Sequence, residues 1–335
     1  MAAAVIGAGA TAEVAGKVAA GRRARNLAWW ALCGLGLALL VGVVVWVVAG
    51  VIHSALPGWS WSIFTAPTTG VGGGLANTIA GTFVLMVGVG ILAGVVGIGT
   101  GVYLSEMARP NMLTSVLRSA SEVLSGIPSI VFGYTGYVAL VVGLHWGFSL
   151  LAALIVLSLL VVPYVAKSTE IALNQVPLSY REGGEALGMA KPHLLRTVVV
   201  RSAIPGMATG LIVALAISVG ETAPLLYTAG FSNSYPSAQL VHAAVPYLTY
   251  ATWTFWNQPT HALHVLAFDS SVLLLTLVLI LVLLARLLVR ATQRYAPERA
   301  AGGARLRRGT RRGAAAPGIG ERPSPRGQQR APRGQ

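Results

Sequence analysis

Charged side chains are scarce in this chain. Only 10% of its 335 residues are charged, whereas a water-soluble domain carries about a quarter. Hydrophobic residues make up 55%, and the mean hydropathy is +0.70. A surface with so little charge suits lipid rather than water. This composition excludes an ordinary soluble domain and predicts an all-α integral membrane protein.

Cysteine is nearly absent as well. Cys33 is the only one, which excludes a disulfide within the chain and a cysteine-rich metal site. We expect Cys33 to be a small apolar residue inside a membrane helix. His261 and His264 lie three residues apart and could share a metal ion, with Asp269 as the nearest carboxylate. A helix face at the membrane interface explains the two histidines better, so the sequence predicts no metal site.

Basic residues are missing from three long stretches. All 24 Lys and Arg residues fall into four blocks, and the stretches 26–108, 119–166 and 202–285 contain none. If each stretch crosses the membrane twice, every basic block lies on one side, which the positive-inside rule makes cytoplasmic. The sequence therefore predicts six membrane spans, with both termini in the cytoplasm. The spans are expected at about Leu27–Val51, Ile79–Leu104, Val123–Leu144, Phe148–Val165, Ala203–Ala229 and Val272–Leu288.

The same pattern divides the chain into four segments. They are a basic cytoplasmic segment (1–26), a first span with an external loop (27–74), a core of five spans (75–290) and a basic tail (291–335). The first apolar run is long enough to cross the membrane, so we expect a retained helix rather than a cleaved signal peptide. The tail is rich in Arg, Gly and Pro and is expected to be disordered, near anionic lipid. Nucleic-acid binding by the tail is the alternative.

Glycine is abundant in the second predicted span. Gly90 and Gly94 are four residues apart, and so are Gly97 and Gly101. This spacing lets membrane helices approach closely, and it predicts a tightly packed span.

Nucleotide and catalytic motifs are missing. No Gly-x4-Gly-Lys-Ser/Thr loop occurs, so the chain has no phosphate cradle for ATP. No Ser/His/Asp or paired-carboxylate constellation stands outside the spans. We therefore expect no catalysis and no bound cofactor, and ATP-driven transport would need an ATPase from a partner. A membrane-embedded enzyme remains an alternative, for which Glu221 would be the only available carboxylate.

The polar stretch 162–206 contains the clearest local signals. Pro177 precedes a short charged helix expected over Ser179–Gly188. Ser179 is expected to cap this helix, with Glu182 at the following capping-box position, and Gly188 is expected to end it. A helix this short is unstable alone and must dock on something.

This stretch resembles the EAA loop of ABC importer permeases. The resemblance implies that this helix is a coupling helix, which sits in a groove of a cytoplasmic ATPase. It assigns eight residues to that helix: Arg181, Glu182, Gly183, Gly184, Glu185, Ala186, Leu187 and Gly188. Gly183 and Gly184 stand where the two alanines usually stand, which costs about 2 kcal/mol of helix propensity. Arg201 occupies the position where proline is usual.

Three further stretches resemble the PstA-type permeases of bacterial phosphate importers. They are GIPSIVFG from Gly126, TEIALNQVP from Thr169 and GETAPLL from Gly220, within a resemblance that covers about 75–290. The resemblance implies a six-span permease fold related to MetI. Pro128, Ser129, Glu221 and Thr222 are then candidates for the translocation pathway. Ile217 departs from these relatives, which often carry arginine there.

The resemblance also implies partners. They are a PstC-like permease subunit, a dimeric ATPase that binds ATP and Mg²⁺, an external phosphate-binding protein and membrane lipid, with no nucleic acid. A permease for another oxyanion, such as sulfate or molybdate, is the alternative function. For Glu221 two roles stay open, because a carboxylate in a membrane helix needs a partner or a task. It lines the pathway, or it forms a structural hydrogen bond to a neighbouring helix.

Overall fold

The computed structural model describes residues 2–69, 72–108 and 111–293. Regular structure in these ranges is helical, apart from an isolated bridge between Thr68 and Gly73. The predicted disorder of the tail falls, from residue 294 onward, outside the described residues.

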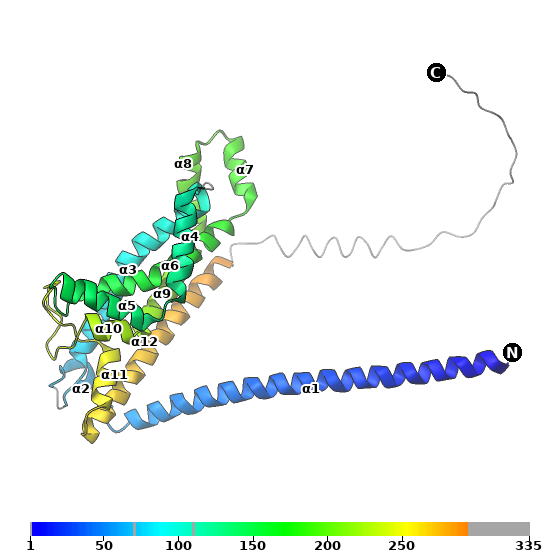
Figure 1. The fold of residues 1–335 in the computed structure, drawn as a ribbon, viewed down its shortest axis with the longest axis horizontal. Coiled ribbons are helices and arrows are strands. Elements are labelled where there is room, and N and C mark those ends of the chain that lie inside the picture. The colour runs from blue at the N-terminus through cyan, green and yellow to red at the C-terminus, as the bar shows by residue number, and fades with distance from the viewer. Residues whose placement is uncertain (1, 70–71, 109–110, 294–335) are drawn as a thin grey trace, which may run out of the picture. The chain divides into compact units, whose positions relative to one another are not determined.

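Short and long helices alternate along the chain (Figure 1). The first half contains α1 (Ala2–Ala55), α2 (Ser62–Thr65), α3 (Ala76–Val102), the π-helical turn η1 (Tyr103–Met107), α4 (Met112–Gly126), α5 (Ser129–Gly136) and the π-helical η2 (Tyr137–Gly143). The second half contains α6 (Leu150–Asn174), α7 (Leu178–Ala186), α8 (Lys191–Leu194), the π-helical η3 (Leu195–Val199), α9 (Val200–Gly220), α10 (Ala223–Thr228), α11 (Leu248–Trp256) and α12 (His261–Gln293).

Five helical stretches are long and apolar enough to cross a membrane, and a bent pair makes a sixth if it counts as one span. The five are Arg25–Ala55, Ala76–Met107, Leu150–Asn174, Lys191–Gly220 and His261–Arg290. The sixth is α4 followed by α5 and η2. The prediction of six spans is confirmed by this all-helical architecture.

The span predicted over Val123–Leu144 is not one continuous helix, because α4 and α5 meet at an angle of 104°. Ile127 has extended dihedral angles (φ −77°, ψ 131°), as does Pro128 (φ −57°, ψ 135°). A proline disfavours the helical region for the residue before it, so the helix ends at Gly126 and a new one begins at Ser129.

Three other spans differ from their predicted limits. Helix α6 continues to Asn174, well past the expected end at Val165, and α12 begins at His261 rather than Val272. Helix α9 ends at Gly220, and the predicted continuation to Ala229 is a separate helix, α10. Apolar length locates a span but not its ends, since polar residues extend a helix beyond the lipid.

Helix α6 lies at the centre of the bundle, packed against α3 and α9. Two-thirds of its most apolar stretch is buried within the chain, compared with none for α1. The largest apolar core lies here and includes Val89 of α3, Leu157 and Val161 of α6, and Ala214 of α9. Most of the other spans expose apolar side chains, which are available to lipid or to another subunit.

Two glycines bring α3 directly against α6. A Cβ added at Gly97 would lie 2.6 Å from Cβ of Val165, and one at Gly101 would lie 2.6 Å from the carbonyl oxygen of Ala166. The backbone of α3 therefore lies directly on α6 at these two glycines, against the side chains of Val165 and Thr169 and the backbone of Ala166, as the glycine spacing predicts. Gly90 and Gly94 instead face α9, at ordinary van der Waals distances.

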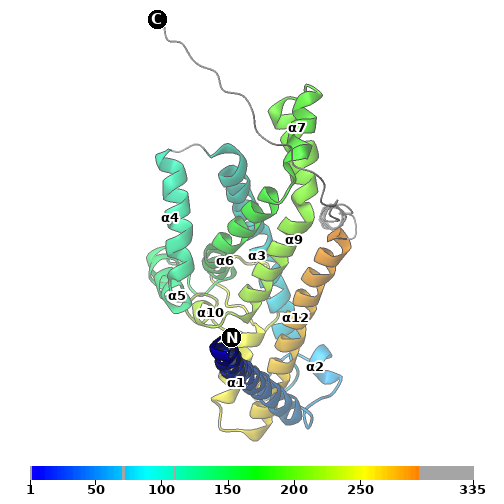
Figure 2. The same cartoon turned by 90° about the vertical axis from the view of Figure 1, so that its right-hand side faces the viewer.

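Figures 1 and 2 show that α7 and α8 lie at one end of the bundle and α2 and α11 at the other. Helix α3 runs from the second end to the first, so its two termini lie near different sets of connecting segments.

Candidate functional site

Helix α7 begins one residue before its predicted start. Its N-cap is Pro177 and no side chain caps it, so the prediction that Ser179 caps the helix is wrong. The predicted end is confirmed, since Gly188 has a φ of +73°, which L side chains rarely adopt. Its N–H donates to the carbonyl of Glu185, and the N–H of Met189 donates to that of Gly184. These two bonds form a Schellman motif.

The two glycines that replace the usual alanines of this loop are not equivalent. Gly184 is the only buried residue of α7, and a Cβ there would collide with the side chain of Leu194 from α8. Gly183 is exposed, with open space where a Cβ would stand. Glycine at position 184 thus lets α8 pack against α7, whereas at position 183 it only weakens the helix.

Apart from Gly184 and Arg181, the residues of α7 are exposed, and several of them are apolar. Leu178 is 65% exposed, Tyr180 53% and Leu187 83%, and Glu182 and Glu185 are exposed beside them. Ala186 and Gly188 complete this surface. Apolar side chains at this exposure, at the tip of a loop, are typical of a surface that another protein covers.

Arg181 joins α7 to the spans. Its two terminal nitrogens donate to the two carboxylate oxygens of Glu106 in η1, both at 2.7 Å, and one also donates to the carbonyl of Leu173 in α6 at 3.3 Å. The Arg181 side chain is 25% exposed and that of Glu106 7%, so water screens the pair only partly. Hydrogen bonding to Glu106 raises the pKa of Arg181, which stays charged at every usable pH.

A second ion-pair cluster lies where α4 meets α6. Glu170, in α6, pairs with Arg118 of α4 at 2.9 Å and with Lys167 one turn earlier at 3.2 Å. Sequence reasoning assigned no role to Glu106, Glu170 or Arg118. Glu106 is 75 residues from Arg181 in the chain and Arg118 is 52 residues from Glu170, although both pairs are in contact in the structure. The resemblance of the stretch around Glu170 was therefore the only sequence signal for these residues.

Glu221 lies at a break between two helices rather than inside one, which corrects its predicted position. Helix α9 ends at Gly220, Glu221 is extended (φ −73°, ψ 126°), and α10 begins at Ala223 with Pro224 in its first turn. Proline is favoured there because its missing N–H has no partner in a first turn. Glu221 and Thr222 are half-buried.

The break lies against α5, which contains two other predicted pathway residues. A Cβ at Gly133 would be 2.6 Å from Cα of Pro224, so α5 and α10 cross in backbone contact. Ser129 is half-buried and Pro128 exposed at the start of α5. The two sequence stretches that contain the four predicted pathway residues, about 90 residues apart, therefore pack together.

The residues at the start of α11, Tyr247–Thr249, form a connection that supports the break from the side. Thr249 donates its hydroxyl to the backbone carbonyl of Glu221 at 3.3 Å. The N–H of Leu248 donates to the hydroxyl of Thr82 in α3 at 3.0 Å, and its carbonyl accepts from Ser270 of α12 at 2.8 Å. This connection thus ties the ends of α3, α9 and α12 together.

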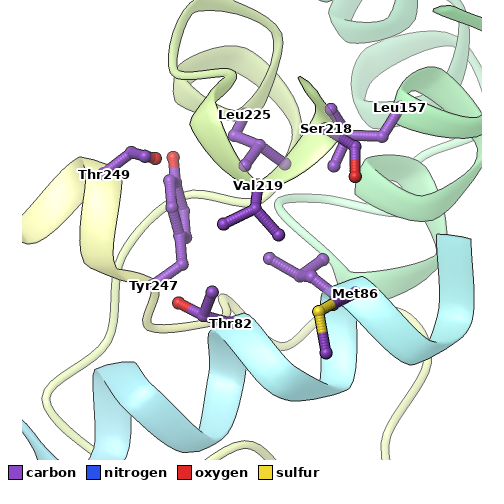
Figure 3. A pocket seen from close by; sticks show the side chains of 9 residues that line it. Thr82, Met86, Leu157, Ser218, Val219, Leu225, Tyr247 and Thr249 are labelled. Carbon is purple, nitrogen blue, oxygen red and sulfur yellow. The ribbon is translucent and has the colours of Figure 1, made fainter. Parts of the chain in front are cut away.

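A small cavity lies beside this connection (Figure 3). Side chains from α3, including Met86, and from the end of α9, including Val219, point into it, and Tyr247 stands on the other side. The centre of a water molecule could occupy about 10 Å³ of this cavity, which is close to the smallest volume that holds one water molecule. The buried Tyr247 hydroxyl has no hydrogen-bond partner in the described part of the chain. Burial raises its pKa, so the hydroxyl keeps its proton.

Within the described residues, no group of three or more His, Cys, Asp or Glu side chains could hold a metal ion. His261 and His264 lie in the first turns of α12, where the imidazole of His264 contacts the carbonyl of Gln258 at 2.7 Å. The arrangement offers two features instead: an uncovered helix anchored by an ion pair, and a carboxylate at a helix break.

Residues 94–296 match the family model described as "Binding-protein-dependent transport system inner membrane component". The chain is 50% identical over 271 residues to the "Phosphate transport system permease protein PstA 2" of Mycobacterium bovis, covering 81% of this chain and 90% of that protein. It is 34% identical to the PstA permease of Yersinia pestis, covering 73% and 83%.

Among solved structures, a chain of the MetNI methionine ABC transporter in an inward-facing conformation is similar, with a TM-score of 0.52 and 21% identity. The match covers 65% of this chain and 95% of that one. At this identity the likeness concerns the fold alone.

Proposed function

Because this chain belongs to the family of binding-protein-dependent transport system inner membrane components, among its PstA-type permeases, we propose that it is a permease subunit of an ATP-driven importer of inorganic phosphate. The observation that carries the proposal is the 50% identity, over most of both chains, to a relative named for phosphate transport. The uncovered face of α7 supports it, because a transport subunit without a nucleotide site needs a surface for its ATPase.

In this proposal α7 is the coupling helix. The exposed side chains of Leu178, Tyr180 and Leu187 enter a groove of the partner ATPase, which binds ATP and Mg²⁺ and hydrolyses ATP. This chain holds no cofactor itself. The resulting orientation has α7 and both termini in the cytoplasm, in agreement with the distribution of basic residues.

A second, PstC-like permease completes the translocation pathway, and an external binding protein delivers phosphate. Glu221, Thr222, Pro128 and Ser129 lie on the segments that form the α5–α10 crossing, and we assign them to the pathway. A carboxylate repels an anion, so Glu221 holds an arginine of the partner permease or accepts a hydrogen bond from monoprotonated phosphate. ATPase closure then moves the coupling helices and alternates the exposure of the pathway.

Reconstitution of the complex tests this function. The chain is co-purified with its ATPase, partner permease and binding protein, and the complex is placed in liposomes. ATP is supplied on the side of the membrane that corresponds to the cytoplasm. We expect uptake of labelled phosphate and ATP hydrolysis stimulated by the loaded binding protein. Uptake of sulfate or molybdate in place of phosphate would show that the assigned substrate is wrong. ATP hydrolysis without movement of any anion would show that the assigned transport role is wrong.

A further inference from the structure

One end of α3 is held by the coupling helix. Glu106 lies in η1, the π-helical turn that continues α3, and its carboxylate accepts hydrogen bonds from both terminal nitrogens of Arg181. A bidentate guanidinium–carboxylate pair fixes direction as well as distance, unlike a single contact. Ser105, the residue before it, donates to the side-chain oxygen of Asn174 at the end of α6 at 3.1 Å. Movement of α7 therefore acts on the end of α3 through a rigid connection.

The other end of α3 is held by the segment that supports Glu221. Thr82 accepts the N–H of Leu248 at 3.0 Å, and Gly81 contacts the carbonyl of Pro246 so closely that a Cβ would not fit. One residue further on, Thr249 donates to the carbonyl of Glu221. Thr82 is buried, as are Leu248 and Thr249, so water does not compete for these bonds.

Between these ends α3 is supported along its length. From Thr82 to Glu106 the chain rises by roughly 36 Å at the usual helical pitch. At Gly97 and Gly101 the α3 backbone lies directly on α6, against the β-branched side chains of Val165 and Thr169, which have little rotamer freedom to yield. A displacement applied at Glu106 is therefore delivered to Thr82 rather than absorbed on the way.

We infer that α3 is the mechanical link between the coupling helix and Glu221, with Arg181, Glu106, Thr82 and Thr249 as its positioning residues. The inference rests on the proposed function of α7 and deepens it. ATP-driven movement of α7 pulls on Glu106, shifts α3 with α6, and moves the Leu248–Thr249 segment. That segment in turn shifts the backbone carbonyl at the α9–α10 break and re-aims the Glu221 carboxylate.

A double-mutant cycle in the reconstituted complex tests the link. Glu106→Gln removes the charge at one end, and Thr82→Ala removes the hydroxyl at the other. Each variant is expected to keep ATP hydrolysis and to lower the phosphate moved per ATP by at least about fivefold, the smallest usual coupling between distant sites. Both substitutions interrupt the same link. The double variant is therefore expected to move as much phosphate per ATP as the more impaired single variant.

Independent sites at this separation would instead multiply their effects. A multiplicative double variant, or a wild-type transport ratio in either single variant, overturns the inference. Thr100→Val is the matched control, because among the described residues its hydroxyl donates only to the carbonyl of Val96 in the same helix, at 2.8 Å. It is expected to leave the ratio unchanged.

Rescue variants separate positioning from folding. If Glu106→Gln or Thr82→Ala fails to assemble, the exchange Glu106→Arg with Arg181→Glu restores the ion pair, and Thr82→Ser restores the hydroxyl. Both are expected to recover the transport ratio. Assembled rescue variants that hydrolyse ATP but remain uncoupled would refute the link.

A third measurement does not depend on the transported anion. Cys33→Ser removes the only cysteine, and Gly220→Cys then places one beside Glu221, where a Cβ meets open space. Its alkylation rate is expected to change with ATP turnover in the parent chain and to stop changing with Glu106→Gln. A complex that moves no phosphate would refute the proposed substrate, while this rate still decides the link. If ATP turnover changes the alkylation rate equally in the parent chain and in the chain with Glu106→Gln, the inferred link is wrong.

Discussion

Glu221 places a charge at a point where the backbone is least constrained. Its own N–H makes only a long bond of 3.3 Å to Ser218, and its carbonyl is held by Thr249 rather than by a helical partner. The position of the carboxylate therefore depends on tertiary contacts and not on a helix. This suits a side chain that must change its orientation during transport.

Glu221→Gln keeps the shape of this side chain and removes its charge. We expect phosphate uptake to fall by about tenfold or more, since a hydrogen bond to a charged group contributes about 1.5–3 kcal/mol. Assembly and ATP binding are expected to persist. Uptake by reconstituted liposomes and nucleotide binding measure the two effects, with Glu221→Asp as the control that retains charge. Unchanged uptake kinetics in Glu221→Gln would eliminate the pathway role.

Gly101 and Gly99 provide a matched pair for the packing of α3. Gly101→Ala would press a methyl group against Ala166 and Thr169, and overpacking of this kind costs about 1–3 kcal/mol. Gly99 meets nothing within 4 Å, so Gly99→Ala is expected to be neutral or to stabilise by up to about 1 kcal/mol. Thermal unfolding of the purified complex measures both. Equal melting temperatures for the two variants would contradict the close contact of Gly101 with α6.

At the scale of an element, α7 depends on how it ends. The Schellman motif at Gly188 needs a positive φ, which costs a residue with a Cβ about 1–2 kcal/mol. The turn also directs the chain back to α8, whose Leu194 fills the space left by Gly184. The glycine at position 188 thus determines the direction of the exposed face as well as the length of the helix.

Gly188→Trp is expected to uncouple transport without preventing membrane insertion, because it strains this turn and adds a large ring beside the exposed face. Gly183→Ala is the control, since it fills open space and improves helix propensity by about 1 kcal/mol. ATP-driven phosphate uptake and membrane content are measured together for both variants. Wild-type uptake by Gly188→Trp would remove the assignment of α7 as the coupling helix.

The elements differ in how far the sequence alone could predict them. The location and end of α7 follow from Pro177 and Gly188, because a turn and a helix cap are local features. The 104° bend was missed although Pro128 is visible, since apolar length dominated the interpretation. The break at Glu221 comes three residues before Pro224, and the pairing of Arg181 with Glu106 spans 75 residues. Nothing local specifies either one.

At the scale of the whole molecule, the distribution of basic residues makes a prediction about orientation. An alkaline phosphatase fused after Arg290 is expected to be inactive, because that end of α12 lies in the cytoplasm of the proposed arrangement. A fusion after Thr65, in the connection between α1 and α3, is expected to be active. Enzyme activity in whole cells, corrected for the amount of each fusion, gives the result. An active fusion after Arg290 contradicts the six-span orientation.

Helix α4 affects how the cell must produce this chain. Ser115, Ser119 and Glu122 follow one another along its exposed surface, within a bent pair apolar enough to cross a membrane. A carboxylate that faces lipid costs about 2.5–3.5 kcal/mol near the bilayer centre. A copy made in excess of its partner permease would keep this surface uncovered and would be a target for membrane proteases. In the proposed complex, we therefore expect its steady-state amount to follow the supply of the partner rather than its own rate of synthesis.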